Sequence, residues 1–142
     1  MTDKEFVDTN ILVYAHDASP AVASKHRIAK ELVERLWVER TGCISLQVLQ
    51  EFYTVSTRKL ARPVLPSVAY EAVEDYLTWT VHTPTGEDIL AAIRQHQRHH
   101  IAFWDALIIR SAQMSRCAVV WSEDLNTHQV FDGISVVNPF QA

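Results

Sequence analysis

Glycine is scarce in this sequence, and its scarcity excludes several large enzyme classes. Only 3 glycines occur among the 142 residues, at Gly42, Gly86 and Gly133, far from one another. A P-loop or a dinucleotide-binding turn needs glycines close together, so that the backbone can approach a phosphate. The sequence also lacks the G-x-S-x-G elbow that positions the nucleophile of α/β hydrolases. The usual P-loop form of nucleotide hydrolysis is therefore excluded.

Cysteine, long apolar runs and an excess of positive charge are also scarce or missing. The 2 cysteines, Cys43 and Cys117, lack metal-ligand spacing, so we expect reduced core residues in a cytoplasmic protein. No apolar run approaches the ~20 residues of a membrane helix, and we expect no secretory leader in the opening MTDKEF. A formal net charge of −4 argues against a protein that binds nucleic acid through a broad positively charged surface. It does not exclude a nuclease, because bound metal ions change the local sign.

Short apolar runs alternate with segments of helical periodicity, a pattern typical of an α/β fold. The expected strands cover residues 4–8, 43–45, 79–83, 118–122 and 134–138. The expected helices cover residues 9–14, 21–40, 46–60, 66–76, 85–99 and 103–115. Strands separated by helices predict a mostly parallel, doubly wound sheet in three α/β/α layers, and we expect one domain over residues 1–142.

Four acidic residues occupy positions where such a sheet gathers its ligands. Asp8 and Asp124 each follow a strand, and Asp105 lies in the first turn of the helix FWDALIIRSA, on its apolar stripe. Glu51 lies on the border of the buried face of its helix. Carboxyl ends of parallel strands and the helix N-termini that follow them meet at one edge of the sheet. We therefore expect these four acids to be neighbours.

Each acid taken alone has a simpler structural explanation. Asp8 and Asp124 could cap short helices. Asp105 could be stabilised by the positive, N-terminal end of its helix, and Glu51 could be a solvated helix residue. Capping explains the four together poorly, because Glu51 is too far into its helix and Asp105 faces the core. Clustered carboxylates raise one another's pKa values unless cations join them, and Mg²⁺ or Mn²⁺ suits such oxygen ligands.

The chemistry that this pattern predicts is metal-assisted hydrolysis of a phosphodiester. A phosphatase of the haloacid dehalogenase type would need a second aspartate two positions after Asp8, where this chain has Asn10. That difference favours a nuclease.

The segments FVDTNILVY, LQEFY, FWDALI and SEDLN, in this order, resemble those of PIN-domain ribonucleases, above all the VapC-type toxins of toxin–antitoxin pairs. The resemblance spans Asp8 to about Asn126. It implies a metal-dependent endoribonuclease whose acidic quartet holds Mg²⁺ or Mn²⁺ and activates a water that attacks RNA phosphorus. By this likeness the quartet maps onto Asp8, Glu51, Asp105 and Asp124.

The resemblance also implies roles and partners. Asp8 and Asp105 would be the main metal ligands, while Glu51 and Asp124 would hold a second ion or ordered waters. Thr9, Asn10 and Ser122 would be the polar helpers. Glu123 stands beside Asp124, which leaves open the carboxylate that faces the metal. The implied partners are an RNA substrate, a second copy of the chain in a homodimer, and a cognate antitoxin that covers the acidic site.

Two other functions remain open at this point: a DNA nuclease with the same site, and a catalytically silent PIN module that binds RNA or protein.

A zinc site at His96 and His100 is disfavoured, because no third ligand and no H-E-x-x-H motif is present. Two basic groups fit either helix-end charges or phosphate contacts: Arg58, Lys59 and Arg62, and Arg94 and Arg98. Four aromatic residues are predicted in the core: Trp79, Trp104, Trp121 and Phe131.

Overall fold

The computed structural model describes residues 3–125 and 129–141, in which strands and helices alternate along the chain. The strands are β1 (Lys4–Val7), β2 (Gly42–Ser45), β3 (Thr80–His82), β4 (Cys117–Trp121), β5 (Val130–Phe131) and β6 (Ile134–Val137). The helices are α1 (Thr9–His16), α2 (Ala23–Glu39), α3 (Leu46–Arg58), α4 (Pro66–Tyr76), α5 (Gly86–His99) and α6 (Phe103–Met114), with a 3₁₀ turn, η1 (Pro20–Val22), before α2. Asn126, where the family resemblance ends, and the outermost residues of the predicted domain lie outside the described ranges.

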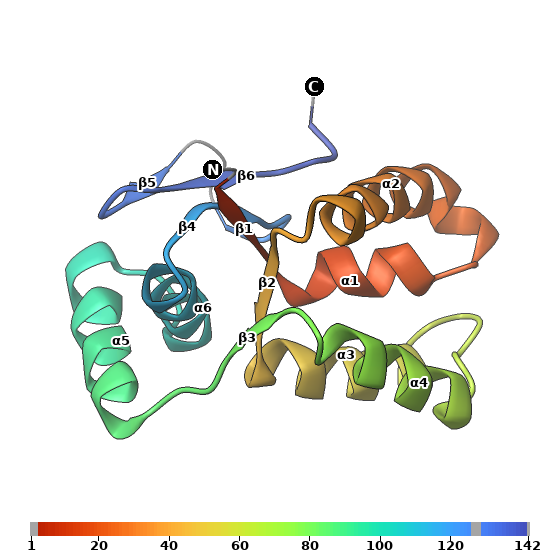
Figure 1. Ribbon diagram of the computed structural model, residues 1–142, viewed down its shortest axis with the longest axis horizontal. Helices are drawn as coiled ribbons and strands as arrows, with labels where there is room; N and C mark the ends of the chain where they lie inside the picture. Colours follow the sequence, from red (N-terminus) through yellow and green to blue (C-terminus); the bar gives the residue numbers. More distant parts are fainter. Residues whose placement is uncertain (1–2, 126–128, 142) are drawn as a thin grey trace.

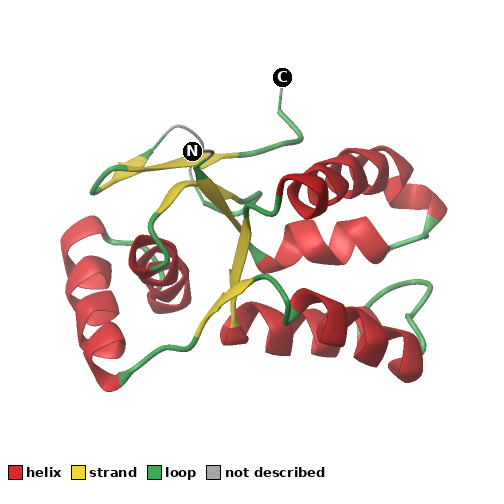
Figure 2. Cartoon of the chain, viewed as in Figure 1, coloured by secondary structure: helices red, strands yellow, loops and turns green. Residues whose placement is uncertain are grey.

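The strands form one sheet in the order β3-β2-β1-β4-β6-β5, and every neighbouring pair is parallel except β5 with β6. Figure 1 shows α5 and α6 on one side of the sheet and α1 to α4 on the other, and Figure 2 shows the same three layers by element type. The predicted three-layer, mostly parallel α/β/α fold is confirmed. None of the helices in the described ranges is long and apolar enough to cross a membrane.

The order of the strands reverses next to β1, at the centre of the sheet. The chain builds β1, β2 and β3 outward, then returns through α5 and α6 and adds β4 on the other side of β1. Val7 pairs with Trp121 at the carboxyl ends of these two strands. The backbone N–H of Asp8 then donates to the carbonyl of Trp121 at 3.0 Å. Such a switch point is the usual ligand site of an open α/β sheet.

The short strand β5 was not predicted from the sequence. Its two residues form a hairpin with β6, in which Phe131 pairs with Ile134. The two turn residues, Asp132 (φ 49°) and Gly133 (φ 89°), have the positive φ values that a tight hairpin turn requires. The dipeptide Asp-Gly is the signal that could have revealed this hairpin.

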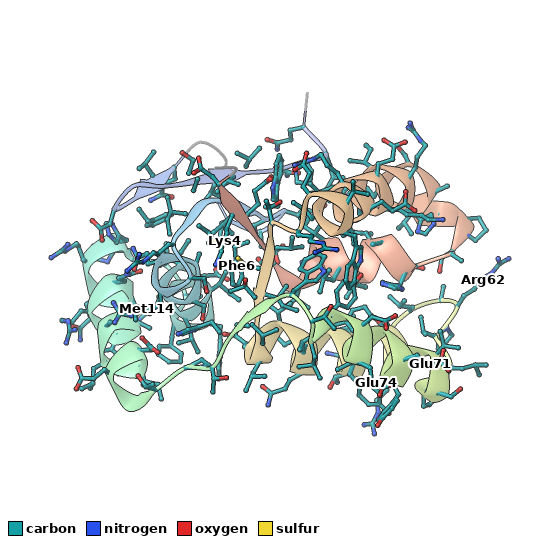
Figure 3. The ribbon with its side chains drawn as sticks, viewed as in Figure 1. Lys4, Phe6, Arg62, Glu71, Glu74 and Met114 are labelled. Carbon is teal, nitrogen blue, oxygen red and sulfur yellow. The ribbon has the colours of Figure 1, made fainter. Side chains whose placement is uncertain are left out.

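Apolar side chains fill the space between the sheet and both helical layers (Figure 3). Phe6, Phe52 and Ile109 are among the largest fully buried side chains. Cys43 and Cys117 are both buried and free, in agreement with their predicted place in the core.

Among the aromatic residues predicted in the core, Trp104 is an exception. Phe131 is fully buried, and Trp79 and Trp121 pack against the core. Trp104 is 63% exposed, so that prediction is wrong for this residue. Its partners at helical spacing, Leu107 and Ile108, are buried. Position 104 differs because it lies in the first turn of α6, where the end of the helix has fewer neighbours to cover it.

Candidate active site

Asp8 joins the end of β1 to the start of α1. Its Oδ1 accepts a hydrogen bond from the backbone N–H of Thr9 at 2.7 Å, so the residue does cap α1. Its Oδ2 accepts a second hydrogen bond, from the hydroxyl of Ser122 at 2.8 Å. The side chain is 7% exposed. Capping therefore accounts for one oxygen of Asp8, and the other is turned toward the end of β4.

Burial is the largest influence on the Asp8 carboxyl group. It raises the pKa to about 6, against the lowering effect of the hydrogen bonds from Ser122 and Thr9. The negative charges of Asp124 and Asp105 raise this pKa further. Asp8 is thus a poorly solvated carboxylate with other acids close by.

Glu51 is held from two sides. The hydroxyl of Thr9 donates to its Oε2 at 3.0 Å, and the amide of Gln47, one helical turn earlier in α3, donates to its Oε1 at 2.9 Å. The same amide lies 3.5 Å from the carbonyl oxygen of Trp104. Gln47 was not among the predicted site residues, although its spacing of four from Glu51 was a usable signal.

Asp124 and Glu123 have different partners. The amide of Asn10 donates to Oδ2 of Asp124 at 2.6 Å. Glu123 forms an ion pair with Lys25 of α2, and the ammonium group of Lys25 lies 5.1 Å from the ring centroid of Tyr14. The structure therefore places Asp124, rather than Glu123, beside the polar start of α1. Nothing in the sequence pattern pointed to Lys25.

Asp105 occupies the first turn of α6 and is half-buried. Among the described residues no hydrogen bond to its carboxylate is present. Burial, followed by the charges of Asp124 and Glu51, raises its pKa. Asp124 behaves in the same way, since partial burial, then the charge of Glu123 and then that of Glu51 raise its pKa.

These electrostatic influences connect four carboxylates, and we refer to Asp8, Glu51, Asp105 and Asp124 as the acidic cluster. Within the described ranges none of them is paired with a lysine, an arginine or a histidine. Their oxygen donors suit a hard divalent cation, which would relieve the repulsion. In the described part of the chain no three acid, histidine or cysteine side chains already lie close enough together to hold an ion. Binding one would therefore require some carboxylates to rotate.

The other polar features singled out in the sequence lie elsewhere. His96 contacts the carbonyl of Ile101 through Nδ1 at 2.5 Å, and His100 ends α5 with a positive φ of 56°, so both serve the end of this helix. The five basic residues of the two predicted groups are exposed. Figure 3 shows one of them, Arg62, at the far edge of the molecule from the sheet.

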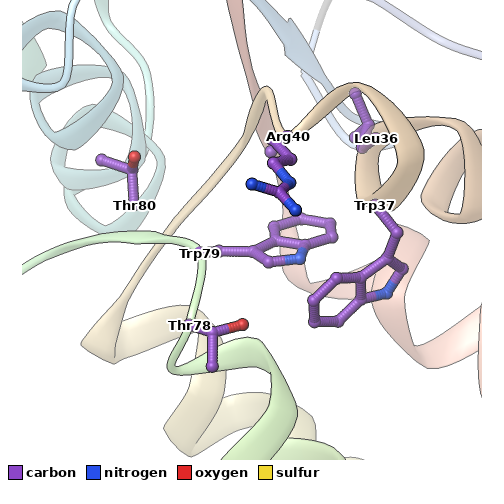
Figure 4. Close-up of a pocket in the computed structure, with 7 residues that line it drawn as sticks. Leu36, Trp37, Arg40, Thr78, Trp79 and Thr80 are labelled. Atoms are coloured by element: carbon purple, nitrogen blue, oxygen red, sulfur yellow. The ribbon is translucent and has the colours of Figure 1, made fainter.

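A pocket of about 500 Å³ opens at the opposite edge of the sheet, where β2 and β3 begin. Its lining residues include Trp37, Arg40 and Trp79, which face one another in Figure 4. Gly42 is required there, because a Cβ atom at this position would lie 2.5 Å from the ring of Trp79. The lining contains no carboxylate, so this pocket does not suit a metal ion.

Comparisons with known proteins agree with this fold. The PIN domain family matches residues 6–132. A toxin–antitoxin complex from Klebsiella pneumoniae contains a similar chain, with a TM-score of 0.72 and 18% identity over 98% of this chain and 100% of that one.

Two further solved structures are similar. One is Mycobacterium tuberculosis VapC20, a sarcin–ricin loop cleaving toxin (TM-score 0.64, 23% identity, 85% of this chain and 92% of that one). The other is DNA-bound VapBC from Salmonella typhimurium (TM-score 0.64, 19% identity, 95% of this chain and 97% of that one). A search of curated proteins gave no match.

Proposed function

The chain belongs to the PIN-domain family, and we propose that it is a metal-dependent endoribonuclease, the toxin of a toxin–antitoxin pair. One observation carries this proposal: four carboxylates, one of them only 7% exposed, influence one another at the switch point of the sheet with no basic residue paired to them in the described chain. A protein that only bound RNA or a partner would have no use for such uncompensated charge.

Mg²⁺ or Mn²⁺ is the proposed cofactor. Asp8 and Asp105 would be its main ligands, and Glu51 and Asp124 would hold a second ion or ordered waters. When bound, such a cation lowers the pKa of water and neutralises charge that develops on a phosphate. Burial first, and then the charges of neighbouring acids, raise the pKa values of Asp8, Asp105 and Asp124, and a bound cation would offset both effects, which supports this assignment.

The chain's own polar residues would set the orientation of the acids. Ser122 fixes Asp8, Thr9 and Gln47 fix Glu51, and Asn10 fixes Asp124. Water would attack phosphorus in line with the departing 3′-oxygen, which takes up a proton as the P–O bond breaks. The products would be a 5′-phosphate and a 3′-hydroxyl, because the ribose 2′-hydroxyl takes no part and no covalent enzyme intermediate forms.

A protein partner is part of the proposal. The similar structures include a toxin–antitoxin complex and a VapBC complex, and we propose a cognate antitoxin, a homodimer and a cytoplasmic location for this chain. Residues 1–142 would act as one nuclease domain. An apolar groove of about 520 Å³ between α3 and α4 supports a protein partner, since Tyr53, Tyr70 and Leu77 are exposed along it.

The test compares wild type with Asp8→Asn on pooled cellular RNA and on single-stranded DNA, with Mg²⁺, Mn²⁺ or a chelator. Glu74→Gln, at an exposed acid of α4 (Figure 3), is the matched control. We expect RNA cleavage by wild type and by the control, and none by Asp8→Asn or with chelator. Cleavage of DNA alone would make the protein a DNA nuclease, and RNA binding without cleavage under every condition would make it a silent module. Equal cleavage by wild type and Asp8→Asn would refute the metal site.

A further inference from the structure

Trp104 presents a large aromatic surface beside an acid of the proposed active site. Its side chain is 63% exposed, whereas the next residue, Asp105, is a member of the acidic cluster. Phe103 supports the indole from one side, with ring centroids 5.2 Å apart and an interplanar angle of 71°. Phe103 itself packs against the small apolar cluster between α5 and α6. The indole therefore contacts one neighbouring ring and is otherwise largely open to solvent.

The position of Trp104 is tied to the acidic cluster through the backbone. The amide of Gln47 lies 3.5 Å from the carbonyl oxygen of Trp104 and donates to Glu51 at 2.9 Å. Consecutive Cα atoms lie about 3.8 Å apart, and the two side chains leave α6 about 100° apart around its axis, so the exposed indole stands beside the half-buried Asp105 and outside the acidic cluster. An RNA strand whose phosphate reached the acidic cluster would pass within reach of the indole.

We propose that Trp104 is a stacking platform for an unpaired nucleobase next to the scissile phosphate, an inference that rests on the nuclease function proposed above. Proteins recognise unpaired RNA largely by stacking bases on aromatic side chains. A chain with a net charge of −4, whose acidic cluster has no basic residue paired to it in the described ranges, gains little from electrostatic attraction to RNA. Stacking supplies affinity without charge. Because every base has a π face, the subsite would tolerate different bases.

The proposal is tested first by binding, with cleavage switched off. In the Asp8→Asn background and with chelator present, the affinity for a labelled single-stranded RNA of mixed sequence is measured after Trp104→Ala, Trp104→Phe and Val38→Ala. Val38 is the control, because it is an apolar side chain that is 83% exposed but lies on α2. We expect Trp104→Ala to weaken binding about tenfold. Trp104→Phe should retain most of the affinity, and Val38→Ala should not change it.

The second measurement scans an abasic nucleotide along the same RNA. An abasic nucleotide at one position, next to the bond that wild type cleaves, should lower the RNA affinity about tenfold in the protein that has Trp104. In Trp104→Ala the same abasic nucleotide should lower the affinity no further. Affinity that is unchanged by Trp104→Ala overturns the proposal, and so does an abasic effect that is the same with and without Trp104. A change of oligomeric size in Trp104→Ala with unchanged RNA affinity would assign the indole to a protein interface instead.

The two proposals fail separately. If wild type cleaves RNA but Trp104→Ala binds as well as its parent, only the stacking platform is refuted. If binding depends on Trp104 but wild type cleaves no RNA, the indole is an RNA-stacking site, while the nuclease function is refuted and with it the place of the base next to a scissile phosphate. If RNA does not bind at all, both are refuted.

Discussion

The hydroxyl of Ser122 donates a 2.8 Å hydrogen bond to the carboxylate of Asp8, across the junction of β4 with β1. The two residues are separated by 114 positions in the sequence. Ser122 is fully buried, and its oxygen also accepts from the backbone N–H groups of Asp124 and Leu125 at 3.2 Å. One hydroxyl therefore connects the first acid of the cluster to the turn that carries the last.

Replacing Ser122 with alanine should cost both stability and activity. The change leaves Asp8 Oδ2 and two backbone donors without their partner, at a cost of about 1–3 kcal/mol in the free energy of unfolding. It also removes a hydrogen bond that lowers the pKa of Asp8, so the acid limb of the pH–rate profile should move to higher pH. Urea unfolding and kcat against pH measure the two effects. Ser122→Thr, which keeps the hydroxyl, should restore the free energy of unfolding and the acid limb. The exposed control Ser67→Ala should change neither quantity. An unaltered pH–rate profile in Ser122→Ala would contradict the role of Ser122 as a hydrogen-bond donor to Asp8.

The burial of Asp8 should impose a stability penalty on the metal-free protein at neutral pH that is relieved in mild acid. Its folded pKa is raised from 3.8 to about 6, so the folded state holds the proton more tightly than the unfolded state does. The resulting penalty is fully present above about pH 6, reaches about 3 kcal/mol at most, and disappears as the pH falls through 6 toward 4. Asp8→Asn keeps a capping side chain and removes this titration.

The measurement is the free energy of unfolding of both proteins in chelator at several pH values from 5 to 8. Subtracting the curve of unfolding free energy against pH for Asp8→Asn from that for wild type cancels the contributions of the other titrating groups. Asp8→Asn should be more stable than wild type at pH 8, and the difference should shrink toward pH 5. A difference that does not vary with pH would mean that Asp8 titrates normally in the folded state.

Much of the fold and part of the site could be predicted from the sequence, because both depend on local patterns. Strands such as β4 are short apolar runs, and Asp8 and Ser122 stand directly after such runs. Parallel topology then brings their ends together. The ion pair of Lys25 with Glu123 joins residues 98 positions apart and follows no periodicity, so only the tertiary structure reveals it.

Burial at helix ends was equally hard to predict. Helical periodicity places Trp104 with buried residues, yet the first turn of α6 leaves it exposed. A similar limit applies to Asp88, which is buried with Arg110 at 2.9 Å and His82 at 3.2 Å. Asp88 also forms a capping box with Thr85 at the start of α5. Its two basic partners come from different elements, and no sequence pattern selects them.

Divalent metal should stabilise the protein through the acidic cluster. Mg²⁺ or Mn²⁺ that binds only the folded state adds about 2.7 kcal/mol at 100 times its Kd, which corresponds to a rise in Tm of about 5 °C or more for a domain of this size. The rise should be larger at pH 8 than at pH 5, where protons compete for Asp8. Asp8→Asn should lose most of it and Glu74→Gln should keep it. An equal rise in all three proteins would show that the ion binds elsewhere.

Glu123 and Asp124 should differ in their effect on catalysis, although they are adjacent. Asn10 orients Asp124, whereas Lys25 holds Glu123. Asp124→Asn should therefore lower kcat about tenfold or more, and Glu123→Gln should change it little.

The charge of Glu123 raises the pKa of Asp124, so Glu123→Gln should move the acid limb of the pH–rate profile to lower pH. Lys25→Met, which leaves Glu123 without its countercharge, should move the same limb to higher pH. A loss of kcat in Glu123→Gln as large as that in Asp124→Asn would show instead that Glu123 is the carboxylate that serves the reaction.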